Sequence, residues 1–123
     1  MPPSIYVQNI RRPVQDPPRI HWCESFSCRL RGLMFRSHLE QSEGLLLVGE
    51  RDSRLDAAIH MLFVPFDLSV VWIDSNLEVV DKIIARRWRL AYVPKKAARY
   101  ILEIHPDRFG DYEIGDRIEF RNV

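Results

Sequence analysis

Short runs of apolar residues, separated by clusters of Gly, Pro, Asp, Asn and Ser, recur along most of this chain. The runs are rich in β-branched and aromatic residues, and several of them alternate with polar positions, which is typical of strands. The expected strands cover residues 4–10, 19–26, 44–49, 57–63, 68–74, 77–84, 88–93, 99–104 and 117–120. Seven or more short strands at this spacing favour a sandwich or a barrel.

One segment has the period of a helix instead. Ser27 is a suitable N-cap, and Leu30, Leu33 and Met34 follow at i, i+3 and i+4, so they would share one buried face. We expect this helix at about residues 28–36, with a single turn at 95–99 as a weaker helical candidate. The fold class is therefore mainly β with a minor α part: a compact antiparallel β-sandwich or barrel with one short helix.

The N-terminal segment, residues 1–18, holds five of the eight prolines. Because proline removes a ladder donor, this segment is expected to form an edge strand and connecting loop. No internal repeat or low-complexity stretch divides the chain, so one domain over residues 1–123 is expected.

Composition is that of a globular protein, with 46% apolar and 28% charged residues. A core of Leu, Ile, Val, Phe and Trp needs no disulfide or metal. The chain starts without the pattern of a secretory signal, and no apolar run approaches the roughly 18 residues that span a bilayer. We therefore expect a cytoplasmic location, where Cys23 and Cys28 would stay reduced.

Several ordered segments resemble one known family. Arg-Gly-Leu-Met-Phe-Arg at residues 31–36 resembles the signature of the bacterial and archaeal domain of unknown function 192. Ile-His-Met-Leu-Phe at 59–63 and Val-Val-Trp-Ile-Asp at 70–74 are similar to its central strand pair. Ala-Arg-Tyr-Ile-Leu-Glu at 98–103 and Gly-Asp-Arg-Ile at 115–118 are similar to its C-terminal elements. Over about residues 22–120, the resemblance implies a compact β fold with a short helix and no established activity.

The chain departs from that family at one position. The family usually carries Pro-x-Asp before the Val-Val-aromatic strand, and a gapless alignment places Ser69 where that Asp would be. Asp67 lies two residues earlier, in Pro-Phe-Asp. Because a shift of two residues keeps the side-chain face of a strand, either the carboxylate is retained at Asp67 or it has been lost.

Four polar residues lie inside or beside apolar runs: Arg36, His60, Asp67 and Glu103. One interpretation is a shallow ligand pocket, in which His60 and a carboxylate bind or activate the ligand and Arg36 binds an anion. The other is a structural network, in which the Arg36 guanidinium pairs with a carboxylate and joins the helix to the sheet.

A basic stretch between residues 82 and 99 contains seven Lys and Arg and no acid. Arg86, Arg87, Arg89, Lys95 and Lys96 could neutralise phosphates, while Trp88 or Tyr92 could stack on bases. Alternatively, this is a solvated loop balanced by the acidic C-terminal segment, with Trp88 at the edge of the core. The overall pI of 7.8 is low for a nucleic-acid-binding protein.

Metal binding is the remaining chemistry to weigh. His21, Cys23 and Cys28 lie close in sequence, with His38, His60 and His105 elsewhere, but a structural zinc site repeats its cysteine pair. Two buried cysteines that fill the core are the simpler interpretation. We therefore expect no metal and no cofactor.

These observations lead to three functional hypotheses. The preferred one is a non-enzymatic binding or accessory domain that recognises a small molecule or a protein near His60 and Arg36. The second is a small hydrolase-like enzyme that uses His60 with Asp67 or Glu103, and the third is a nucleic-acid contact through residues 82–99. The expected partner is a small molecule or protein, with nucleic acid disfavoured, no membrane contact, and a monomer or small homo-oligomer as the assembly.

Overall fold

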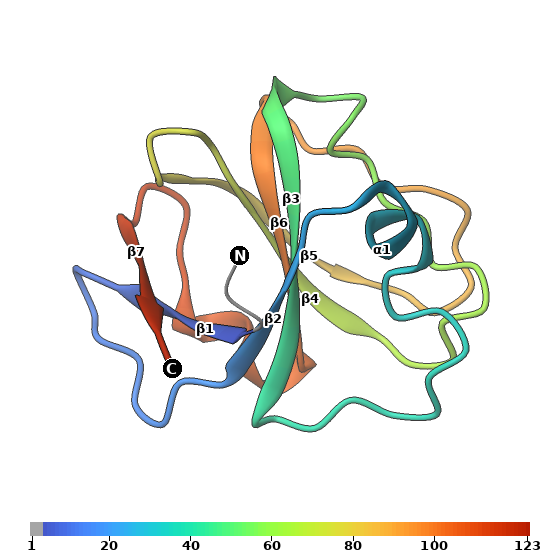
Figure 1. The fold of residues 1–123 in the computed structure, drawn as a ribbon, viewed down its shortest axis with the longest axis horizontal. Coiled ribbons are helices and arrows are strands. Elements are labelled where there is room, and N and C mark those ends of the chain that lie inside the picture. The colour runs from blue at the N-terminus through green and yellow to red at the C-terminus, as the bar shows by residue number, and fades with distance from the viewer. Residues whose placement is uncertain (1–3) are drawn as a thin grey trace.

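Seven strands form one curled sheet in the computed structural model, which describes residues 4–123. Their order across the sheet is β5-β4-β6-β3-β2-β1-β7, and the sheet curls into a half-barrel (Figure 1). Strands account for 42% of the chain and helices for 10%, which confirms the mainly β prediction. The strands are β1 (Ser4–Asn9), β2 (Arg19–Cys23), β3 (Glu43–Ser53), β4 (Leu68–Ile73), β5 (Val79–Ala85), β6 (Ala98–Ile104) and β7 (Ile118–Asn122).

All neighbouring strands pair antiparallel except β2 and β3, which run parallel from Arg19↔Glu43 to Cys23↔Leu47. A parallel pair needs a crossover, and here the helix α1 (Phe26–Arg31) and the loop after it supply it. At one end the two edge strands, β5 and β7, approach each other, because an antiparallel β-bridge pairs the backbones of Glu78 and Arg117 beside the start of β5.

Both faces of the central strands are buried, which explains why their sequences read as continuous apolar runs. On β3, Leu45 and Leu47 belong to one core cluster, while Leu46 and Val48 belong to the other. The second cluster includes residues of β1 and β7 and fills the half-barrel; we call its face of the sheet the inner face. The first lies on the opposite, outer face, where α1 and the loops run in Figure 1.

The structure confirms the strand character of seven of the nine predicted segments, with shifted ends. The segments 57–63 and 88–93 are wrong as strands: they share only the single bridge Ile59↔Tyr92. Phe63 and Trp88 have φ values of 59° and 65°, a left-handed conformation, and each lies in a turn at one end of its segment. Pro2 and Pro3 of the proline-rich segment lie outside the described residues.

Helix α1 begins two residues earlier and ends five residues earlier than predicted. Ser25, not Ser27, is its N-cap and accepts a hydrogen bond from the Cys28 N–H, and Gly32 ends it with a φ of 49°. None of its residues is buried, so the predicted buried face is wrong for Leu30, which is 59% exposed. The buried Leu33 lies beyond the helix.

A second short helix, the 3-10 helix η1 (Pro106–Asp111), was not predicted. The expected turn at residues 95–99 is wrong, because β6 already begins at Ala98. Over residues 4–123, no helix is long and apolar enough to cross a membrane.

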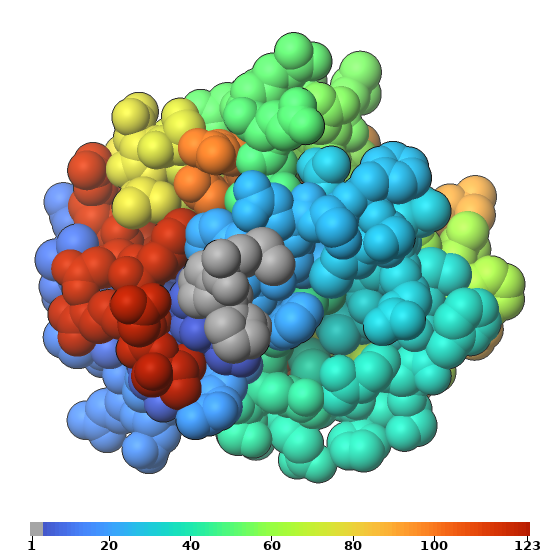
Figure 2. All heavy atoms as spheres, in the orientation of Figure 1, coloured from blue at the N-terminus to red at the C-terminus, as the bar shows by residue number. Residues whose placement is uncertain are grey.

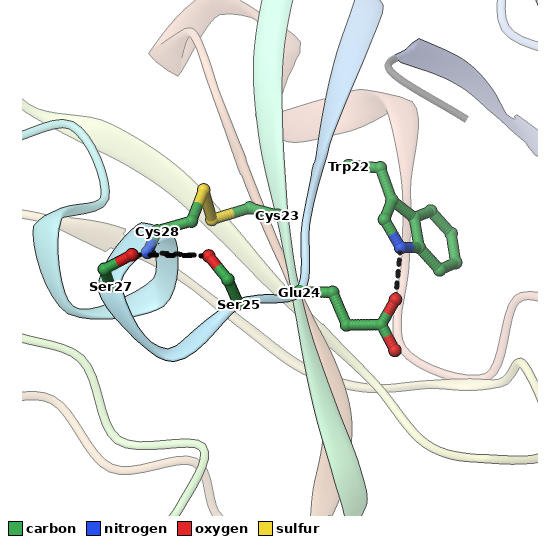
Figure 3. Close-up of a disulfide and its surroundings, with 6 residues drawn as sticks. All are labelled: Trp22, Cys23, Glu24, Ser25, Ser27 and Cys28. Atoms are coloured by element: carbon green, nitrogen blue, oxygen red, sulfur yellow. Dashed lines mark hydrogen bonds between the residues drawn. A yellow bond between two sulfur atoms is a disulfide. The ribbon is translucent and has the colours of Figure 1, made fainter. Parts of the chain in front are cut away.

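A disulfide joins Cys23, the last residue of β2, to Cys28 in α1 (Figure 3). The expectation that both thiols stay reduced is therefore wrong. The short connection between β2 and α1 holds the two Cα atoms 5.6 Å apart, within the range that a disulfide bridges. The bond attaches a helix that buries none of its own residues to the sheet.

Candidate functional site

A pocket of about 500 Å³ lies between α1 and the outer face of the sheet. Residues of α1, β3, β6 and the loop 56–64 line it. In the space-filling view, α1 and the loop that follows it, coloured light blue to cyan, form one continuous part of the surface (Figure 2). The pocket therefore has a wall of sheet on one side and a wall of helix and loops on the other.

Glu103 is the buried acidic residue of the sheet wall. It lies on β6 two residues after Ile101, so both side chains share the outer face, and only 5% of its surface is exposed. No side chain or backbone group among residues 4–123 makes a hydrogen bond to its carboxyl. Burial raises the pKa of Glu103 to about 7, because the ionised form has lost its hydration without gaining a donor.

The segment that follows α1 passes over this carboxyl. A β-carbon built on Gly32 would lie 3.9 Å from Oε1 of Glu103, and the φ of 49° at Gly32 suits glycine. Leu33 and Met34 continue the pocket lining from there. The Arg-Gly-Leu-Met segment thus forms the wall that faces Glu103.

Arg29 supplies a second polar group with no partner. It lines the pocket from α1, and its Nε is buried without a hydrogen bond among the described residues. Its guanidinium also forms no ion pair with Glu103, although both residues line one cavity. The sequence interpretation overlooked Arg29, and because α1 ends at Arg31, helical spacing from the buried Leu33 does not identify it.

The other charged side chains of the lining have partners or face water. Arg51 lies 3.7 Å from Asp56 in an exposed pair, and the Nε of Arg99 donates to the Gly49 carbonyl at 3.0 Å. Arg31 and Glu50 are exposed. The Glu103 carboxyl and the Arg29 Nε are therefore the lining groups that are shielded from water and lack a hydrogen-bond partner among the described residues.

His60 also lines the pocket, and it is half-buried. Its Nδ1 accepts a hydrogen bond from the backbone N–H of Leu62 at 3.3 Å. Over the described residues, it makes no hydrogen bond or ion pair with a carboxylate. Of the four residues singled out in the sequence, the structure thus brings His60 and Glu103 into one pocket without pairing them.

Arg36 and Asp67 lie outside that pocket. Arg36 is exposed and pairs with Glu43, donating to both carboxylate oxygens at 2.9 Å. Asp67 accepts hydrogen bonds from the backbone N–H of Arg87 and from the guanidinium groups of Arg87 and Arg86, which hold its pKa below the ordinary value. The four residues do not form one constellation.

Asp67 and Ser69, the two positions that could correspond to the family's Asp, have different environments. Asp67 precedes β4 and contacts the arginines just described, whereas Ser69 lies inside β4 and is fully buried. The Ser69 hydroxyl donates to the Pro106 carbonyl at 3.2 Å. Ser69 therefore joins β4 to η1 and presents no carboxylate.

The basic stretch is exposed but partly neutralised. Asp67 pairs with Arg86 and Arg87, while Arg89, Lys95 and Lys96 are exposed and form no ion pair among the described residues. Trp88 was expected at the edge of the core, but it is 52% exposed. Its ring packs edge-on against Phe63, which in turn stacks on Phe35.

The disulfide removes both cysteines from the set of possible metal ligands. Elsewhere in residues 4–123, no group of three or more His, Cys, Asp and Glu is arranged to hold a metal ion.

The model of the family DUF192, described as "Uncharacterized ACR", matches residues 9–120. The chain belongs to the DUF192 family. The resemblance found in the sequence is thereby confirmed. Two similar proteins are a UPF0127 protein of Thermococcus gammatolerans, 41% identical over 103 residues, and one of Pyrococcus furiosus, 35% identical over 107 residues.

The matched region covers a different share of this chain than of each relative. The match spans 82% of this chain but 65% of the Thermococcus gammatolerans protein, against 85% of this chain and 88% of the Pyrococcus furiosus protein. A second Thermococcus relative, from Thermococcus kodakarensis, is covered over 52% of its length. The chain thus spans about half to two thirds of these Thermococcus proteins.

A crystal structure of a protein of unknown function from Novosphingobium aromaticivorans has the same fold. It superimposes with a TM-score of 0.79 at 19% identity, covering 94% of this chain and 83% of that one. Identity this low supports the fold alone. The family therefore accounts for the architecture and leaves the activity to be inferred from the pocket.

Proposed function

We propose that this protein is a non-enzymatic binding domain, and that its pocket takes a small ligand with an apolar body and a polar group that hydrogen-bonds to Glu103. One observation carries the proposal: Glu103, a residue with 5% of its surface exposed, lines a cavity, and its carboxyl has no hydrogen-bond partner among the described residues. Burying such a group without a partner costs several kcal/mol. A bound ligand would supply the missing partner.

The rest of the lining suits the apolar part of a ligand. Leu47 and Ile101 come from the sheet, Met61 and Val64 from the loop 56–64, and Leu33 from the segment after α1, all of them buried. A volume of about 500 Å³ is within the usual range for small-molecule sites. These side chains would enclose the apolar body of a ligand, while charged side chains such as Glu103 and Arg29 occupy other parts of the lining.

The hydrolase alternative has less support. It requires His60 to work with a carboxylate, but Nδ1 of His60 is occupied by the Leu62 N–H. Asp67 is held by Arg86 and Arg87, and Glu103 forms no hydrogen bond with His60. A general base within reach of an oriented nucleophile is the geometry that such an enzyme needs.

The cytoplasmic location expected from the sequence stays a prediction. The disulfide Cys23–Cys28 is more typical of an oxidising compartment than of a reducing cytosol, although intracellular proteins of hyperthermophiles also carry disulfides. Titration of free thiols in protein prepared under alkylating conditions would show whether the bond exists in the cell.

The test is a methyl NMR titration with hexanol, hexylamine and hexanoate, three compounds that share an apolar body and differ in their polar group. We expect at least one of them to shift the methyl signals of Met61, Leu47 and Ile101 in a saturable way. Ala58→Phe places a ring at a half-buried lining position and should abolish these shifts, whereas Ala97→Phe, at an exposed position outside the pocket, should retain them.

Two results would overturn the proposal. The first is that all three compounds leave the pocket methyls unmoved at millimolar concentration. The second is that Ala58→Phe, with its fold verified by circular dichroism, retains the shifts of the unmodified protein.

A further inference from the structure

Two polar groups of opposite charge remain without a partner in this pocket, and they do not pair with each other. From this arrangement we infer that the occupant is zwitterionic: an amino acid or a related amine–acid compound with an apolar body. Its ammonium group would meet the carboxylate of Glu103, and its acid group would meet the guanidinium of Arg29. This inference rests on the proposed function and names its ligand class.

The Glu103 carboxyl has no hydrogen-bond donor, and a cationic donor from the ligand would suit it best. Within residues 4–123 no Lys, Arg or His forms an ion pair with this carboxyl. An ammonium group would supply a charge-assisted hydrogen bond, which is roughly twice as strong as a neutral one. The attraction would also be strengthened by the burial of the site, because the local dielectric is lower than that of water.

The Arg29 guanidinium lacks a hydrogen-bond acceptor for its Nε–H, which the acid group of a ligand would supply. Its Nε is buried with no hydrogen bond among the described residues, so one donor of the guanidinium has lost water without gaining a partner. Carboxylate and phosphate groups match the planar donors of arginine in a two-point contact. The other lining arginines differ, because Arg51 pairs with Asp56, the Nε of Arg99 donates to Gly49, and Arg31 is exposed.

A ligand with a single charge fits the cavity less well. A simple cation would meet the four arginines of the lining, and a simple anion would lie near the carboxylate of Glu103. The charged groups that line the cavity are Arg29, Arg31, Glu50, Arg51, Asp56, His60, Arg99 and Glu103. A zwitterion places its ammonium group beside the carboxylate of Glu103 and its acid group beside the guanidinium of Arg29. It adds no net charge to the cavity.

The experiment measures affinities at pH 8, above the pKa of about 7 for Glu103, so that the carboxyl is mainly ionised. The probes are 4-aminobutanoate, 6-aminohexanoate and 8-aminooctanoate, which vary the spacing of the charges, against hexylamine and hexanoate. We expect the best of the three zwitterions to bind at least tenfold more tightly than either singly charged compound.

Two variants locate the charges. Glu103→Gln and Arg29→Gln should each weaken the best zwitterion by about tenfold or more. The controls Glu40→Gln and Arg11→Gln change exposed residues outside the pocket and should leave the affinity unchanged.

The outcomes separate this inference from the proposed function. If hexylamine, hexanoate or hexanol binds in the pocket and no zwitterion binds more tightly, the inference fails and the proposed function stands. If no compound binds, both fail. The comparison of probes on the unmodified protein needs no variant, so a variant that does not fold leaves the test intact.

Discussion

Gly32 lies over the carboxyl of Glu103, where a β-carbon at position 32 would stand 3.9 Å from Oε1. The end of α1 thus covers a buried acid on the outer face of the sheet, and neither contributes a hydrogen-bond donor to the other. Because that acid has no partner among the described residues, its protonation affects the stability of the fold. This relationship leads to the first prediction.

Glu103→Gln should remove a pH dependence of stability. The pKa of Glu103 is raised from the ordinary 4.5 to about 7 in the folded state, so the folded chain holds this proton more firmly than the unfolded chain. Its contribution is therefore fully present below pH 4.5 and is lost as the pH rises through 7, a loss on the order of 3 kcal/mol. Urea unfolding should show that the free energy of unfolding of the variant, relative to that of the unmodified protein, is higher at pH 8 than at pH 4.5.

Asp116→Asn is the matched control of opposite sign. Burial alone would raise the pKa of Asp116, but hydrogen bonds from the Glu113 N–H, Asn9 and Arg12 outweigh it and lower the pKa. Its stabilising effect is present above pH 3.8 and is lost as the pH falls through the lowered pKa. Because this loss begins only below pH 3.8, Asp116→Asn should leave the stability difference between pH 4.5 and pH 8 unchanged. If it removed that difference, as Glu103→Gln should, the proposed environment of Glu103 would be incorrect.

Cys28→Ala should lower the free energy of unfolding by about 2 kcal/mol, because the disulfide closes a short loop and restricts the unfolded chain. The loop runs from Cys23 in β2 to Cys28 in α1, a sequence separation of 5. Thermal unfolding with and without dithiothreitol provides the measurement. The reductant should bring the unmodified protein to the stability of the variant and leave the variant unchanged; equal stability in both conditions would argue against the bond.

Gly44→Ala should destabilise the sheet by about 1–3 kcal/mol through overpacking. A β-carbon there would lie 2.7 Å from Cδ1 of Ile20 and 2.8 Å from the backbone oxygen of Glu103, between strands that are already paired. Gly110→Ala is the control, since its β-carbon would meet nothing within 4 Å. Denaturant midpoints should fall for the first variant and stay level or rise slightly for the second. A level midpoint for Gly44→Ala would mean that β3 packs more loosely than described.

Arg36→Ala should change stability by less than about 1 kcal/mol, because exposed ion pairs contribute little. The Arg36 and Glu43 side chains are 44% and 32% exposed, and Arg36 lies outside the pocket. A titration with the best of the three zwitterions should give an unchanged affinity, in contrast to Arg29→Gln. A large loss of affinity in Arg36→Ala would place the ligand on a different surface from the one proposed.

Local sequence patterns were enough to predict most strands and to identify two residues, His60 and Glu103, that line the pocket. The run at 44–49 predicted a strand because β-branched and aliphatic residues buried on both faces leave no polar alternation. Glu103 was recognisable as a candidate because it is an acid within an apolar run. Residues 57–63 and 88–93 failed as strands because they pair only at the bridge Ile59↔Tyr92, between turns at 56–57, 62–63 and 87–88. Sequence propensity does not reveal the left-handed conformations of Phe63 and Trp88 in two of these turns.

The sequence by itself determined the mainly β class and the family, and it identified Glu103 as an acid within an apolar run. Only the tertiary structure decided which groups meet: that Arg36 pairs with Glu43 and Asp67 with Arg87, that Cys23 bonds Cys28, and that Arg29 shares a cavity with Glu103. The physical reason is that periodicity reports which face of an element is buried. The order of strands and the path of the crossover, which place those faces against each other, come from packing between residues far apart in the chain.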